Sequence, residues 1–132
     1  GGHLEVLRLL FEKGADVTQA ANDGATPAIA AAFKGRLEVL ALLVEKGNAD
    51  VNQANEDGWT PAIIAAQNGH LEMLALLVEK GADLNQANAK GWTPAIAAAF
   101  KGRLEVLALL VEKGADLNQA NAKGWTPAIA AA

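Results

Sequence analysis

Few side chains in this 132-residue chain could act as a nucleophile or catalytic base. Cysteine, serine and tyrosine are absent, so the threonines carry the only hydroxyl nucleophiles. Four of the threonines precede a proline at equivalent positions, which is typical of a repeated helix cap and not of a unique catalytic group. His3 and His70 both follow a glycine at a place that Arg36 and Arg103 occupy elsewhere, which favours a capping or surface role. The sequence therefore predicts no enzymatic activity and no cofactor.

One cluster of oxygen-bearing side chains invites comparison with a calcium-binding loop: Asp50, Asn52, Asn55 and Asp57. The EF-hand pattern requires Asp or Asn at its fifth position and Glu at its twelfth, where this chain has Ala54 and Pro61. The cluster is better explained by Asx turns, in which a side-chain oxygen accepts a nearby backbone N–H. Glycine-rich phosphate-binding motifs are also absent, so no metal or nucleotide site is predicted.

The overall composition is that of a folded, water-soluble chain. Hydrophobic residues make up 52% and charged residues 20%, and the net charge of −4 argues against a nucleic-acid partner. No apolar run approaches the roughly 18 residues that a membrane helix requires, so no membrane contact is predicted. The absence of a secretory core and of a glycosylation acceptor favours an intracellular location, either cytoplasmic or nuclear, and cytoplasmic by default.

Internal repetition is the strongest pattern in the sequence. Residues 33–47 recur unchanged at 100–114, and residues 84–99 recur unchanged at 117–132. Thr-Pro pairs recur every 33 or 34 residues, and they begin at Thr26, Thr60, Thr93 and Thr126. The single longer interval contains EKGNAD where other copies have EKGAD, which identifies Asn48 as an inserted residue.

Each unit carries signals for two helices and a polar loop. Threonine followed by proline predicts the start of a short alanine-rich helix. This helix should end at Gly35, Gly69 and Gly102 in successive units. A second, leucine-rich helix should follow and end at Gly47, Gly81 and Gly114. The next residues are rich in Asn, Asp and Gly, which predicts a turn or hairpin.

These motifs resemble those of the ankyrin repeat family. The matching segments are G-x-T-P, A-A-x-x-G-[HR]-L-E and L-L-V-E-K-G-A-D-[VL]-N, and they cover the whole chain. The resemblance implies a mainly α solenoid of stacked helix-turn-helix units with projecting β-hairpin loops. The family commonly has T-P-L-H where this chain has T-P-A-I, so apolar packing should replace a polar network at the start of each first helix.

We expect one domain over residues 1–132, because no repeat can bury its apolar face without a neighbour. Three full repeats should lie between two partial ones: 1–20, 21–54, 55–87, 88–120 and 121–132. Neither terminal unit has the polar outer face of a capping repeat. Two explanations are open: the chain is an excerpt of a longer array, or copies associate head to tail.

The resemblance implies a non-enzymatic role in protein recognition, through a concave groove and the hairpin tips. Aromatic residues recur at two positions that face this groove in the family: Trp59, Trp92 and Trp125, and Phe33 and Phe100. Exposed aromatic residues are frequent binding anchors. The alternative is that each tryptophan packs on the adjacent hairpin and stiffens the stack.

The expected hairpin tips change sign along the chain. The early tips are acidic at Asp23, Glu56 and Asp57, whereas the later tips are basic at Lys90 and Lys123. Lys34 and Lys101 add positive charge beside the phenylalanines. Such a polarised row would orient a protein or peptide partner and tune its association rate. The alternative is an ordinary solvated surface, and the alternative function is head-to-tail self-assembly of the chain.

Overall fold

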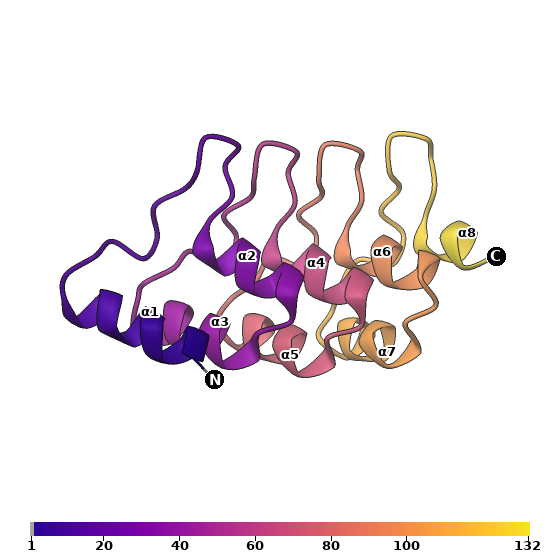
Figure 1. Ribbon diagram of the computed structural model, residues 1–132. Helices are drawn as coiled ribbons and strands as arrows, with labels where there is room; N and C mark the ends of the chain where they lie inside the picture. The colour runs from indigo at the N-terminus through magenta and orange to yellow at the C-terminus, as the bar shows by residue number, and fades with distance from the viewer. Residues whose placement is uncertain (1) are drawn as a thin grey trace.

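The computed structural model describes residues 2–132 and contains eight helices in this range. The helices form two rows, and four loops project from one side of the stack (Figure 1). The first helix of each unit lies in the row next to the loops: α2 (Pro27–Lys34), α4 (Pro61–Asn68), α6 (Pro94–Phe100) and α8 (Pro127–Ala131). The second helices form the other row: α1 (Gly2–Glu12), α3 (Leu37–Glu45), α5 (Leu71–Glu79) and α7 (Leu104–Glu112). This arrangement confirms the predicted helix-turn-helix solenoid.

The first helices begin where the Thr-Pro pairs predict. In α4, the hydroxyl of Thr60 accepts the N–H of Ile63 at 3.2 Å, and Pro61 occupies the first turn, where its missing N–H costs nothing. The same cap precedes α2, α6 and α8. Gly69 ends α4 in the left-handed conformation at a φ of 73°.

The second helices end in two different ways. Gly81 and Gly114 adopt left-handed conformations after α5 and α7, with φ values of 94° and 84°. After α3, however, the left-handed residue is the inserted Asn48, with a φ of 57°, and the prediction that Gly47 ends this helix like the others is wrong. Asparagine tolerates this conformation better than most residues. Close packing instead favours glycine at position 47, because a Cβ there would lie 2.7 Å from a methyl carbon of Val17.

The core lies between the two rows of helices and is best developed in the middle of the stack. All six residues from Pro61 to Ala66 of α4 are buried, and so are all six from Pro94 to Ala99 of α6. Their alanines allow neighbouring first helices to approach closely, while leucines of the second helices fill the space beneath. The isoleucines of T-P-A-I are buried in the first three copies, which confirms the predicted apolar packing.

The projecting loops have the shape of hairpins. One backbone hydrogen bond closes the base of each, for example from the N–H of Asn88 to the carbonyl of Trp92 at 3.0 Å. Within residues 2–132 no residue forms a regular β-strand, because the turn provides too few cross-loop bonds for a ladder. We use "loops" below for residues 21–25, 55–59, 88–92 and 121–125.

Adjacent loops are in direct contact at their tips. The N–H of Glu56 donates to the carbonyl of Asp23, and the N–H of Ala89 donates to that of Asp57, each at 2.9 Å. A Cβ on Gly58 would lie 2.8 Å from the backbone nitrogen of Ala89, so only glycine permits this approach. The tips therefore form one continuous row along the stack.

A second set of hydrogen bonds joins successive repeats at the base of the loops. The side-chain oxygen of Asn52 accepts the N–H of Asp83 at 2.7 Å, and Asn85 accepts the N–H of Asp116 at 2.8 Å. The equivalent position in the first unit is Thr18, whose hydroxyl and N–H both donate to Asp16 instead. The junction between the first two units therefore lacks this bond.

Replacement of Asn52 by threonine should give the second junction the chemistry of the first. We expect Asn52→Thr to lower the free energy of unfolding by about 1–2 kcal/mol, because the N–H of Asp83 loses its partner. Urea denaturation followed by circular dichroism measures this change. The matched control is Asn118→Thr, since the Asn118 side chain bridges no repeats among residues 2–132. Equal losses for the two variants would contradict this assignment.

Candidate protein-binding surface

Three of the predicted binding residues meet at the end of α6. The indole of Trp92 and the ring of Phe100 form an edge-to-face pair with centroids 5.1 Å apart and planes at 71°. The Nζ atom of Lys101 lies 5.6 Å from the centroid of Phe100, within range of a cation–π interaction. Trp92 is half-buried and Phe100 is 48% exposed, so the pair presents apolar surface to solvent. We call these three residues the aromatic cluster.

The position of Trp92 is fixed by its loop. The side-chain oxygen of the buried Asn88 accepts the N–H groups of both Lys90 and Trp92 at 3.0 Å. Thr93, the next residue, caps α6. Trp92 is thus held between a closed loop and a capped helix, which makes its placement largely rigid.

Sequence reasoning did not identify the asparagines as the groups that position the tryptophans. Asn55 and Asn121 accept the N–H groups of Trp59 and Trp125 in the same way, at 3.0 and 2.9 Å. The recurrent N-x-x-G-W pattern could have indicated this role of the asparagines. The first loop, which has Ala25 in place of tryptophan, also lacks the asparagine.

Trp59, Trp125 and Phe33 lie at equivalent positions but do not form pairs within residues 2–132. Trp59 is half-buried against the core, whereas Trp125 is 38% exposed and Phe33 is 49% exposed. Trp59 and Phe33 have no ring partner because the sequence differs at the partner position. Gln67 replaces the phenylalanine that would pair with Trp59, and Ala25 replaces the tryptophan that would pair with Phe33. Only the unit at 88–120 has both rings.

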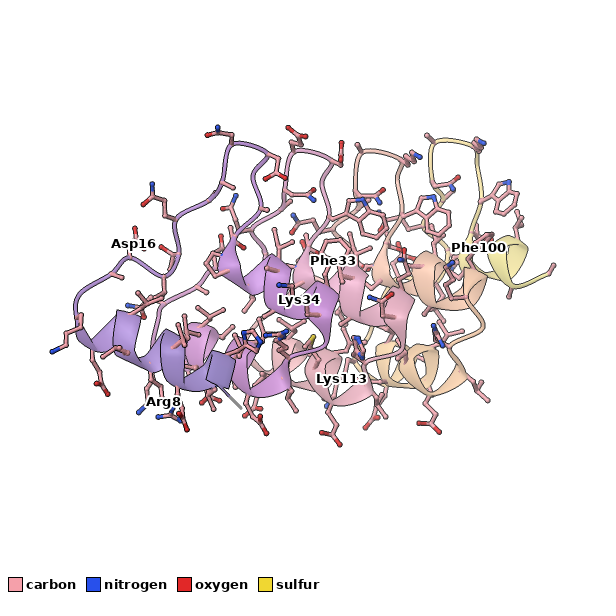
Figure 2. All side chains as sticks on the ribbon, in the orientation of Figure 1. Arg8, Asp16, Phe33, Lys34, Phe100 and Lys113 are labelled. Carbon is pink, nitrogen blue, oxygen red and sulfur yellow. The ribbon has the colours of Figure 1, made fainter. Side chains whose placement is uncertain are left out.

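The predicted charged residues are exposed, and they border the same surface. Figure 2 shows Phe33 and Lys34 together at the end of α2, and Phe100 further along the stack. The tip side chains are exposed: Asp23, Glu56, Asp57, Lys90 and Lys123. Within the described range the one ion pair joins Lys80, which follows α5, to Glu45 of α3 at 3.9 Å, so none of these tip residues is paired.

The oxygen-rich segment at 50–57 forms Asx turns, as predicted. The carboxylate of Asp50 accepts the N–H of Asn52 at 2.9 Å, and the Asn55 side chain accepts that of Asp57 at 3.0 Å. No group of three or more His, Asp or Glu side chains in residues 2–132 is arranged to hold a metal ion. None of the helices in that range combines the length and apolar character needed to cross a membrane.

The residues after the inter-helix glycines serve as contacts between repeats. The ring of His70 lies so close to Gly35 that a Cβ there would be 2.9 Å from it. Arg103 uses its Nε atom to donate to the carbonyl of Gln67 near the end of α4, at 3.0 Å. Both contacts support the structural role predicted for His70. His3, at the same position of the first unit, is exposed on α1.

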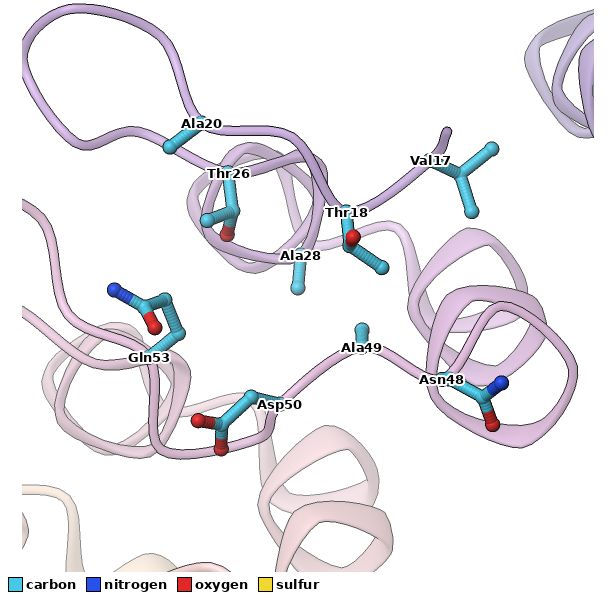
Figure 3. A pocket seen from close by; sticks show the side chains of 9 residues that line it. All are labelled: Val17, Thr18, Ala20, Thr26, Ala28, Asn48, Ala49, Asp50 and Gln53. Atoms are coloured by element: carbon cyan, nitrogen blue, oxygen red, sulfur yellow. The ribbon is translucent and has the colours of Figure 1, made fainter. Parts of the chain in front are cut away.

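A cavity of about 320 Å³ lies at the junction between the first two units, away from the aromatic cluster. Figure 3 shows Thr18, Ala49, Asp50 and Gln53 around it. It forms where the Asn-mediated bond between repeats is missing. Hydrogen bonds from the hydroxyl and the N–H of Thr18 lower the pKa of the Asp16 carboxyl nearby. The cavity therefore coincides with the one junction where Thr18 replaces the bridging asparagine.

The comparison with known proteins agrees with this geometry. A family model described as "Ankyrin repeats (3 copies)" matches residues 1–88 and 83–132. The chain belongs to the ankyrin repeat family, whose members are generally protein–protein interaction modules and typically non-enzymatic. A search of curated proteins found no match.

The aromatic pair should contribute measurably to stability. We expect Phe100→Ala to lower the free energy of unfolding by about 0.5–1.5 kcal/mol more than Phe33→Ala, because only Phe100 has a ring partner. The two phenylalanines have nearly equal exposure and stand in identical local sequence, so Phe33→Ala is a matched control. Urea denaturation of both variants tests this, and equal losses would contradict it.

Proposed function

We propose that this chain is a non-enzymatic module that binds a protein or peptide partner through the concave groove and the hairpin tips. The observation that carries the proposal is the aromatic cluster. Two aromatic rings and an ammonium group are held beside a row of exposed charged tips. Aromatic side chains in fixed, partly exposed positions supply much apolar contact area at little entropic cost.

The burial pattern also supports separate surfaces for stacking and for partner binding. The alanine faces of α4 and α6 are used entirely for stacking, so they are not accessible to a partner. The loops and the ends of the first helices carry side chains that stacking does not bury. The partner-binding residues we propose are therefore Trp59, Trp92, Trp125, Phe33, Phe100, Lys34, Lys101 and the charged tips.

Selection from a displayed library of random peptides tests this function. We expect wild-type protein to enrich peptides whose affinity falls tenfold or more in the Trp92→Ala/Phe100→Ala double variant, since hot-spot residues contribute about 2 kcal/mol or more. The matched control is Val111→Ala, which removes an exposed apolar side chain from α7, outside the proposed binding surface. Circular dichroism must show that the double variant remains folded. Enrichment that is independent of the aromatic cluster would contradict the proposal.

The second candidate function is head-to-tail self-association, and one comparison favours it. Ile29, Ile63 and Ile96 are at most 1% exposed, but Ile129 is 49% exposed at the same position of α8. At the other end of the stack, Leu10 of α1 is 48% exposed. An apolar cavity of about 270 Å³ adjoins it between α1, α2 and α3. A second copy placed in register would cover both faces.

Light scattering over a range of concentrations tests this second candidate. We expect the mean mass to rise with concentration, because a heterologous contact propagates unless it closes into a ring. Ile129→Glu and Leu10→Glu should each restore the monomer mass. Ala75→Glu, a charge on the exposed side of the central helix α5, should leave association unchanged. A wild-type protein that remains monomeric at every concentration would exclude self-association.

A further inference from the structure

The later part of the loop surface is purely basic. Over residues 88–101 and 121–132, which hold two loops together with α6 and α8, the charged side chains are Lys90, Lys101 and Lys123. The nearby acidic residues Glu105, Glu112 and Asp116 lie on α7 or just after it. We call the set Lys90, Trp92, Phe100, Lys101, Lys123 and Trp125 the basic-aromatic patch.

The patch is continuous because its two loops touch. A Cβ on Gly91 would lie 2.8 Å from the backbone nitrogen of Ala122, so the tips that carry Lys90 and Lys123 are adjacent. The backbone N–H groups of Lys90 and Trp92 both donate to the side-chain oxygen of Asn88. Trp92 in turn contacts Phe100, which lies under the ammonium group of Lys101. A chain of contacts thus runs from the tip to the end of α6.

The cations of the patch have no internal counter-charge. The single ion pair among residues 2–132 involves Lys80 and Glu45, so no carboxylate lies within 4.0 Å of the three ammonium groups of the patch. Unpaired cations next to exposed aromatic rings complement a ligand that carries both negative charge and apolar groups.

We propose that the basic-aromatic patch binds an extended acidic segment of a partner protein, and this inference rests on the proposed function. The carboxylates of the segment pair with Lys90, Lys101 and Lys123. Its apolar side chains pack on Trp92 and Phe100. The acidic tips of the first two loops repel the same segment and confine it to the later repeats, so the sign change fixes its register.

Single-stranded nucleic acid also combines anions with stacking groups, but the charge distribution favours a peptide. The net charge is −4, and the row of tips continues directly into Asp57, Glu56 and Asp23. A polyanion with a charge at every unit would be repelled there. A short acidic segment can end before it reaches those tips.

Fluorescence anisotropy at low salt tests the inference. The probes are fluorescein-labelled peptides of repeated Glu-Leu-Gly units, matched peptides of Lys-Leu-Gly units, and oligothymidylate of similar length. We expect the Glu peptide to bind more tightly than both other probes. Lys90→Glu/Lys123→Glu should weaken it about tenfold, because two surface charge pairs are lost. The matched control is Lys46→Glu/Lys113→Glu, which makes the same two charge reversals at the C-terminal ends of the second helices α3 and α7.

The outcomes separate this inference from the proposed function. Tighter binding of the Lys peptide or of oligothymidylate would overturn the inference, and so would an equal effect of Lys46→Glu/Lys113→Glu. If library peptides depend on Trp92 and Phe100 but carry no excess of carboxylates, the inference fails and the proposed function stands. If no selected peptide depends on the aromatic cluster, the proposed function fails as well.

Discussion

Each repeat of this chain can bury its apolar face only against a neighbouring repeat, and most of the structure follows from that constraint. The helix α4, with a first helix on either side, buries six consecutive residues, whereas α1 buries none. Ile96 and Ile129 stand in identical local sequence, yet the first is fully buried and the second is half-exposed. Burial is thus decided by neighbours and not by local sequence.

The loops also depend on neighbouring repeats, but through hydrogen bonds between polar groups. Backbone hydrogen bonds join the tips of the first three loops, and Asn52 and Asn85 bridge consecutive repeats beneath them. The alanine faces and these polar groups are used in contacts between repeats, whereas the aromatic rings and the charged tips remain at the surface. The surface proposed for partner binding is therefore the part of each repeat that the stack does not use.

Much of this fold follows from the sequence because its determinants are local. A Thr-Pro pair fixes a helix start through one hydroxyl and one ring, and a period of 33 residues locates every equivalent position. The end of α3 was harder to predict, since Gly47 and Asn48 could each adopt the left-handed conformation and the local sequence does not decide between them. The pairing of Trp92 with Phe100 likewise depends on the path of the chain between them. The charged tips and the tryptophans can be placed from the sequence, but their partner cannot.

Amide hydrogen exchange on the identical segments 84–99 and 117–132 tests the central claim most directly. The N–H of Ala97 donates to Thr93 and that of Ala130 donates to Thr126, both at 3.0 Å, so the local hydrogen bonds are the same. The neighbours differ, since α6 is flanked by α4, α7 and α8, whereas α8 packs on α6. If neighbours determine stability, Ala97 should exchange far more slowly than Ala130. Equal protection of the two amides would show that local sequence, and not stacking, stabilises each repeat.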